Sequence, residues 1–168
     1  MDDNTKRIVK EVVQFLIIIA IVLFVKQFIV TPVQVSGDSM YGTLEDGDVM
    51  ILNKIGYKIG GIRRFQIVVV NNKGTLLIKR VIGLPGETVK YEDNQLFING
   101  KEMEETFLKD GIVTNDFETV VGDDCYFVMG DNRKVSYDSR ELGCFDISKI
   151  EGTTSITIFP FTRFGGKS

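Results

Sequence analysis

The chain has 168 residues, of which 43% are hydrophobic and 26% charged, values that fit one ordinary domain with a short appendage. Its net charge of -3 leaves no basic surplus to neutralise phosphates, so nucleic acid is not expected as a partner. The chain contains no histidine, which argues against a zinc site and removes the usual partner of a nucleophilic serine. We expect no cofactor.

The first thirty residues contain the longest apolar stretch of the chain. Residues 12–25 read VVQFLIIIAIVLFV, and the span from Ile8 to Val30 has 23 residues, the length that a tilted membrane-spanning helix needs. The stretch is apolar on every side, unlike a buried core helix, and VKQFIVTPV offers no small-residue cleavage site of the kind a secretory signal carries. An uncleaved membrane anchor is therefore predicted over those two alternatives.

Basic residues precede the anchor and indicate its orientation. Lys6, Arg7 and Lys10 favour a cytoplasmic N-terminus, so residues 1–30 would form the cytoplasmic end and the anchor. Residues 31–168 would form an extracytoplasmic β-rich domain. Compartments outside the membrane can be oxidising, which favours a disulfide between Cys125 and Cys144, although two separate buried thiols remain the alternative.

The rest of the chain shows the pattern of a mainly antiparallel β domain. Thr31-Pro32 ends the anchor helix, because proline disfavours helical geometry in the residue before it. No long amphipathic helix pattern follows. Asn99-Gly100 is the strongest turn signal, and the acidic region 101–124 is expected to be an irregular excursion at the domain edge. Short β-branched runs predict strands at 49–54, 65–72, 76–83, 95–100, 125–130 and 154–161.

Ser39 lies in the polar stretch SGDSMYGTL, a plausible place for a nucleophile, and without histidine it needs another base. A lysine can serve only when its amine is neutral, and burial lowers the pKa of a lysine. Lys79 is the lysine that lies in apolar sequence, LLIKRVI, where strand alternation places it on one face with Leu77 and Val81. The alternative is a lysine that reaches solvent at a sheet edge.

A second polar stretch, GDNRKVSYDSRELG at 130–143, directly follows the apolar run CYFVM. Ser136, Asp138 and Arg140 alternate in it, so an extended conformation would place all three on one face. A hydroxyl there could orient the Lys79 amine, and an ion pair between Asp138 and Arg140 could stiffen the loop. The alternative is a solvated turn with a surface ion pair, which contributes little stability.

Together these segments resemble the bacterial type I signal peptidases, membrane-anchored Ser-Lys endopeptidases that remove signal peptides from exported proteins. The resemblance covers most of the chain, in the order of the family, through SGDSMYGTLEDGDVMILNK, KRVIGLPGE, GDNRKVSYDSRELG and IFPFTRFG. It implies a β-sheet or barrel-like catalytic domain with Ser39 as nucleophile and Lys79 as general base. The supporting residues it implies are Ser136 orienting the lysine, Asp138 with Arg140 holding the loop, and Asp131 bracing it against Arg80.

The resemblance also implies partners and substrates. Exported preproteins would be cut after small residues of the A-x-A type, with Met40 contributing to substrate binding. Met40 and the segment 159–161 could also rest against lipid. The oxyanion of the reaction would accept a hydrogen bond from the Ser39 N–H, since Gly37 stands where some relatives carry a hydroxyl donor.

Two further positions depart from the family pattern. Gly42 replaces the proline of S-M-x-P-T-L, and Phe65-Gln66 replaces a Gly-Asp pair. These changes leave open a non-cleaving accessory factor or chaperone for surface-protein or pilus assembly. A self-cleaving repressor-type Ser-Lys protease is a further alternative, but it would carry a DNA-binding module where this chain has an apolar helix.

Overall fold

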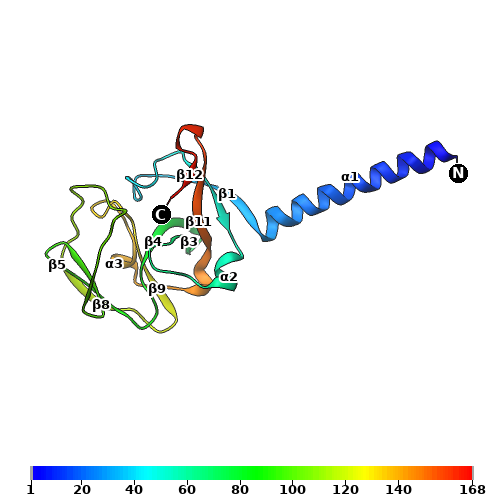
Figure 1. Cartoon of the computed structure of the whole chain (residues 1–168). Helices are drawn as coiled ribbons and strands as arrows, with labels where there is room; N and C mark the ends of the chain where they lie inside the picture. Colours follow the sequence, from blue (N-terminus) through cyan, green and yellow to red (C-terminus); the bar gives the residue numbers. More distant parts are fainter. Residues whose placement is uncertain (1, 168) are drawn as a thin grey trace.

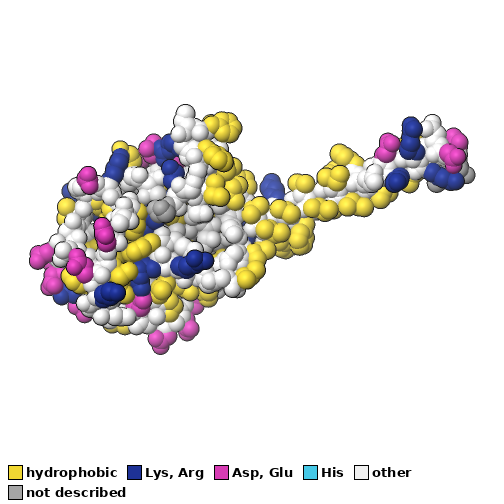
Figure 2. Space-filling model, viewed as in Figure 1, with side chains coloured by type: hydrophobic (Ala, Val, Ile, Leu, Met, Phe, Trp, Pro, Cys, Tyr) yellow, Lys and Arg dark blue, Asp and Glu magenta, His cyan; other side chains and the backbone are white. Residues whose placement is uncertain are grey.

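The structure is a computed structural model and describes residues 2–167. Helix α1 (Asp3–Phe28) projects from the β domain as one long rod, with charged side chains gathered at its free end and apolar ones along its length (Figures 1 and 2). None of its side chains is buried, and within the described residues it is the one helix long and apolar enough to cross a membrane. This helix fits the predicted anchor.

Two antiparallel sheets form the domain. In the larger sheet the strand order is β1 (Val30–Gln34), β2 (Val49–Asn53), β11 (Ile150–Phe159), β3 (Ile67–Asn72), β4 (Thr75–Gly83), β9 (Cys125–Met129) and β10 (Phe145–Asp146), with β12 (Gly165–Gly166) also paired to β11. The smaller sheet has the order β7 (Lys101–Met103), β6 (Gln95–Ile98), β5 (Thr88–Glu92) and β8 (Phe117–Val120). The mainly antiparallel β fold is confirmed, and the larger sheet is open rather than closed into a barrel.

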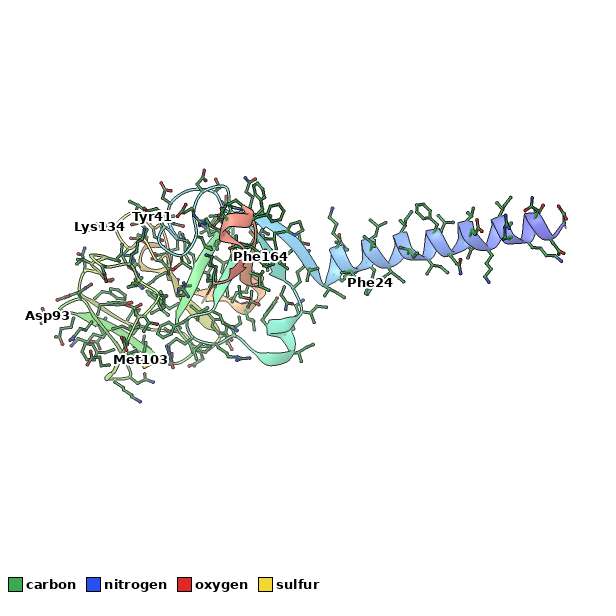
Figure 3. The ribbon with its side chains drawn as sticks, turned by 45° about the horizontal axis from the view of Figure 1, so that its top comes forward. Phe24, Tyr41, Asp93, Met103, Lys134 and Phe164 are labelled. Carbon is green, nitrogen blue, oxygen red and sulfur yellow. A yellow bond between two sulfur atoms is a disulfide. The ribbon has the colours of Figure 1, made fainter. Side chains whose placement is uncertain are left out.

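Helices in the domain are short, as the sequence predicted. They are α2 (Gly56–Gly60), α3 (Ser139–Leu142) and the 3₁₀ turns Ile147–Lys149 and Phe161–Arg163. The smaller sheet lies at the end of the domain farthest from α1, where Asp93 and Met103 are labelled, whereas Phe164 lies toward α1 (Figures 1 and 3). The smaller sheet therefore lies away from the point where α1 joins the domain.

All six predicted strands are present, with bounds shifted by a few residues, and the Asn99-Gly100 turn joins β6 to β7. The sequence reasoning missed β1, because Pro32 was interpreted only as a helix stop. Pro32 lies opposite Ile51 on an edge strand, where a missing N–H costs no ladder hydrogen bond on the open side. The excursion 101–124 contains β7 and β8, which are the two edges of the smaller sheet.

Three apolar clusters hold these layers together. One lies around Val68, Val81 and Val128 in the larger sheet, and a second joins β4 and β9 to the smaller sheet through residues such as Ile82 and Phe127. The third consists of Val35, Met40, Leu44, Met50 and Ile67, and it lies directly beneath the turn that carries Ser39. Each fully buried side chain of this kind contributes roughly 1.5–3 kcal/mol, so the turn is fixed from below.

Cys125 and Cys144 form a disulfide, which settles the alternative left open by the sequence. Cys125 begins β9, and Cys144 directly precedes β10. The bond closes a loop with a sequence separation of 19 that contains the whole GDNRKVSYDSRELG stretch.

Candidate active site

Ser39 lies in a turn between β1 and β2, half-buried at the surface of the third apolar cluster. Two backbone N–H groups, from Thr43 and Leu44, donate to the Met40 carbonyl at 3.1 and 2.9 Å and close the turn. The Gly37 N–H donates to Asp46 Oδ1 at 2.8 Å. Because Met40 and Leu44 are 1% and 0% exposed, the core holds both sides of the turn while Ser39 stays accessible.

Lys79 lies on β4 and is 3% exposed. Burial lowers the pKa of its amine, and the charge of Asp138 opposes that shift without cancelling it. Both faces of β4 are buried from Lys79 to Gly83, so the alternative of a lysine reaching solvent at a sheet edge is excluded. Ser39 and Lys79, forty positions apart, line one cleft of about 400 Å³.

The cleft lies between two strand edges that lack partners in the described sheet. β1 pairs with β2 on one side only. β4 pairs with β9 from Arg80 onward, so its residues 75–79 are paired to β3 alone. The lining also includes Met40, Val69 and Ile78. An extended peptide could therefore add main-chain hydrogen bonds along either edge.

The loop after β9 is hydrogen-bonded to the nucleophile turn. The Asn132 N–H donates to the Ser39 carbonyl at 3.0 Å, and Asn132 Nδ2 donates to the Asp38 carbonyl at 3.1 Å. Gly130 makes this approach possible: a Cβ at that position would lie 2.4 Å from Ser39 O and 2.2 Å from Ser136 Oγ. Sequence reasoning missed both Asn132 and Gly130, although they stand in the GDN turn signal.

Asp138 and Arg140 pair as predicted, but the segment is not extended. Asp138 caps α3, and Arg140 Nε and Nη2 donate to its two carboxylate oxygens at 2.9 Å each. Burial alone would raise the pKa of Asp138, but Arg140, the nearby Ser136 hydroxyl and the Gly130 N–H hold it below the usual value. The prediction that Ser136, Asp138 and Arg140 share one face of an extended segment is wrong, because Asp138 caps the start of a helix here.

Ser136 is 6% exposed, and its Oγ makes no hydrogen bond of ordinary geometry among the described residues, although it lies close enough to Asp138 to help lower the pKa of that carboxyl. The hydroxyl lies against Gly130 beneath the nucleophile turn. A buried hydroxyl without a partner loses the free energy of a hydrogen bond, so such groups often serve a ligand or a mobile side chain. The predicted hydrogen bond between Ser136 and Lys79 is not made in the described residues, whereas the other predicted supporting pairs are formed.

Arg80 and Asp131 form a buried ion pair, as the resemblance implied. Arg80 is 0% exposed, and its Nε and Nη2 donate to the Asp131 carboxylate at 2.9 and 2.7 Å. Thr43 Oγ1 donates to the same carboxylate at 2.5 Å, and Arg80 Nη1 donates to the Phe65 carbonyl at 2.8 Å. One ion pair thus joins β4, the GDN loop and the nucleophile turn. Thr43, part of the SMYGTL stretch, was not singled out from the sequence.

The two departures from the family pattern have structural counterparts. Gly42 has φ +107°, which proline cannot adopt because its ring fixes φ near about -65°. Phe65 has φ +67°, a conformation that glycine accepts freely and that costs other residues about 1–3 kcal/mol. Its ring packs on Phe107 with centroids 5.1 Å apart, and Phe107 also stacks beneath the Arg80 guanidinium at 3.9 Å. Gly42 lies within the turn that carries Ser39, and Phe65 is linked to that turn through Arg80, which donates both to the Phe65 carbonyl and to Thr43 Oγ1.

The expectation that Met40 rests against lipid is wrong. Its side chain is 1% exposed and forms part of the cleft wall and of the third apolar cluster. Three phenylalanines of the C-terminal segment are well exposed: Phe159, Phe161 and Phe164 are 52%, 81% and 65% exposed. Figure 2 shows apolar side chains gathered at this segment, on the side from which α1 leaves the domain.

A buried amine and a half-buried hydroxyl that line one cleft with room for an extended chain suit acyl transfer, and the class defined by this fold and site is the serine-type peptidase. The family model described as "Signal peptidase, peptidase S26" matches residues 8–159. The chain belongs to this family.

Individual relatives agree with the family assignment. Signal peptidase I of Bacillus caldolyticus is 40% identical over 161 aligned positions, covering 87% of this chain and 88% of the relative. Signal peptidase IB of Staphylococcus aureus (strain COL) is 38% identical over 178 positions, covering 92% and 93%. The crystal structure of a signal peptidase I from Enterococcus faecalis V583 superposes with a TM-score of 0.51 at 35% identity, covering 55% of this chain and 95% of that one.

Proposed function

We propose that this peptidase removes signal peptides from exported preproteins by cutting after small residues, with Ser39 as nucleophile and Lys79 as general base. The observation that carries the proposal is the shared cleft: in a chain without histidine, the half-buried Ser39 and the buried Lys79 line the same hollow. Membership of the signal peptidase family supplies the substrate class.

The reaction begins with Lys79 neutral, which its lowered pKa favours. Lys79 accepts the Ser39 proton while Ser39 Oγ attacks the scissile carbonyl, and the resulting oxyanion accepts a hydrogen bond from the Ser39 N–H. The lysine then donates its proton to the leaving amine, and the C–N bond breaks to give an acyl-enzyme. Lys79 next activates a water molecule, which hydrolyses the ester and frees Ser39.

The supporting residues act by holding these two groups in register. Ser136, with its unpartnered hydroxyl, is proposed to orient the Lys79 amine during the reaction. Asp138 and Arg140 fix the loop that carries Ser136. The ion pair of Arg80 and Asp131, described above, fixes the GDN loop against β4. Catalysis of this kind is sensitive to errors of about 1 Å in position.

The proposed preference for small residues follows from strand geometry. A peptide extended along the cleft points its first and third residues before the cut in the same direction, because side chains alternate along a strand. The packed wall that includes Met40, Val69 and Ile78 would then limit the size of both. This agrees with an A-x-A type cleavage site.

The proposed topology places the N-terminus in the cytoplasm and the β domain outside it. Lys6, Arg7 and Lys10 lie at the free end of α1, as the positive-inside tendency requires. The exposed Phe159 and Phe161 belong to the same C-terminal segment as Phe164, which lies on the α1 side of the domain in Figure 3, and we propose that they contact the lipid interface.

Cleavage of a preprotein carrying Ala at the first and third positions before the cut tests the proposal, with the full chain in detergent micelles. We expect the wild type to cut once, and Ser39→Ala and Lys79→Met to lose at least about 10³-fold in kcat/KM. Ser148→Ala and Lys101→Ala, at exposed positions outside the cleft, are the matched controls. An inactive wild type, or active Ser39→Ala, would refute the proposal.

The non-cleaving accessory factor remains the second candidate because of one observation. Gly42 holds a backbone conformation closed to the family's proline, directly within the nucleophile turn. If the folded wild type binds signal peptides without cutting them, this second function replaces the first.

A further inference from the structure

Ser39 and Lys79 line a second hollow as well as the cleft described above. This second hollow, of about 440 Å³, extends from the pair toward the loop after β9 and is lined there by Asn132, Val135 and Tyr137. The cleft extends instead toward β1. Ser36, Ser39, Leu77 and Lys79 line both, so the catalytic pair proposed above stands where two adjoining depressions meet.

The position of the anchor indicates which part of a substrate enters each depression. β1 begins at Val30, two residues after α1 ends at Phe28, so the cleft along β1 is the one that continues toward the membrane. A signal peptide has its apolar core in the bilayer, and its end therefore reaches Ser39 from this side. An extended chain crosses Ser39 once, so the residues after the cut must leave on the other side, through the second hollow.

The wall of the second hollow is apolar at two exposed positions. Val135 and Tyr137 are 62% and 60% exposed and line the hollow, so both present apolar surface to a ligand that enters it. Their backbone is fixed, because the buried residues Ser136 and Asp138 flank Tyr137 and the Val135 N–H donates to the Asn132 carbonyl at 3.2 Å. The surface is thus preformed.

The hollow also contains one acidic group. Asp38 lines it, and the Asp38 carbonyl holds the Asn132 side chain in place. A carboxylate at this position repels an acidic side chain that enters the hollow. Apolar contact with Val135 and Tyr137 and repulsion by Asp38 therefore both favour an apolar side chain over an acidic one in this hollow.

We propose that Asn132, Val135 and Tyr137 form a subsite for the first residues of the mature chain, one that favours an apolar side chain and disfavours an acidic one. The inference rests on the proposed function, since it needs a peptide bond cut at Ser39. It makes the sequence after the cut, and not only the A-x-A residues before it, a determinant of which preproteins are processed.

Quenched fluorescent peptides test the inference, again with the full chain in micelles. All peptides share one A-x-A signal segment and carry Leu, Gly or Asp as the residue after the cut, and a further substrate ends in a chromogenic anilide at that point. We expect kcat/KM to fall in the order Leu, Gly, Asp, with about a tenfold difference between Leu and Gly, the discrimination typical of a small apolar contact.

Variants assign the preference to the subsite. In Tyr137→Ser and Val135→Ser, we expect kcat/KM for the Leu peptide to fall until it is close to kcat/KM for the Gly peptide. We expect kcat/KM for the anilide to fall less, because the anilide has no residue after the cut. Val120→Ser removes an apolar side chain that is 72% exposed on β8, outside both depressions, and is the matched control.

Three results would count against the inference. Equal rates for all residues after the cut in the wild type would overturn the subsite while leaving the proposed function intact. An equal loss for peptides and anilide in Tyr137→Ser would mean that Tyr137 only supports Ser136 and Asp138. A wild type that cuts none of the substrates would overturn the proposed function itself, and the subsite with it.

Discussion

Replacing Gly130 by alanine tests whether the contact between the GDN loop and the nucleophile turn positions the site. The added Cβ would lie 2.4 Å from Ser39 O and 2.2 Å from Ser136 Oγ, whereas ordinary contact begins at 3.4 Å. The backbone around Ser39 and the Ser136 side chain must therefore each move by about 1 Å. Gly130 has no left-handed φ, so alanine adds only this steric conflict.

A displacement of about 1 Å in a catalytic group costs on the order of 10²-fold in rate, and overpacking of a fitted contact costs roughly 1–3 kcal/mol of stability. Gly130→Ala should lower kcat for preprotein cleavage by about that factor while the β domain stays folded. Thermal unfolding measured by circular dichroism checks that the β domain of the variant stays folded. Gly60→Ala is the control, since Gly60 has no neighbour within 4 Å and no left-handed φ. Wild-type kcat in folded Gly130→Ala would refute the reasoning.

Three further predictions concern the ion pair, the base and the disulfide. Asp131→Asn leaves the fully buried Arg80 without a counter-charge and should cost about 3–5 kcal/mol in urea unfolding, and additivity with Arg80→Met in a double-mutant cycle would contradict the coupling. Because burial lowers the pKa of Lys79, cleavage should rise as pH increases through that lowered pKa and the amine becomes neutral; a pH-independent kcat/KM from pH 5 to pH 9 would exclude a lysine base. Replacing Cys125 and Cys144 by serine should lower the free energy of unfolding by about 3 kcal/mol relative to the oxidised wild type. The reduced wild type should show the same loss, and a reduced wild type as stable as the oxidised one would contradict the prediction.

Much of the fold was predictable from local sequence. Six strands and the apolar helix follow from patterns of one or two dozen residues, since burial on one face or all faces leaves a periodic record in the sequence. β1 was missed because Pro32 is a strong local signal for a break, and only its position at a sheet edge makes it compatible with a strand.

The candidate site divides in the same way. The lack of histidine and the apolar surroundings of Lys79 pointed to a lysine base. The polar stretch itself suggested the pair Asp138–Arg140 and the resemblance supplied Arg80–Asp131, and both pairs are present. The common strand face expected for residues 136–140 failed, because helix capping by Asp138 outweighs simple alternation.

The sequence by itself determined which groups are available for chemistry: a serine in a polar turn, a lysine in an apolar strand, no histidine, and an apolar helix ahead of them. The tertiary structure alone decided how these groups meet. Ser39 and Lys79 reach one cleft through packing of β1 and β4 on a shared core, and Gly130 lets the GDN loop approach the turn that carries Ser39. Such contacts depend on long-range packing, which leaves no periodic signal in the chain, and so neither the second hollow nor the conformation of Gly42 could be foreseen.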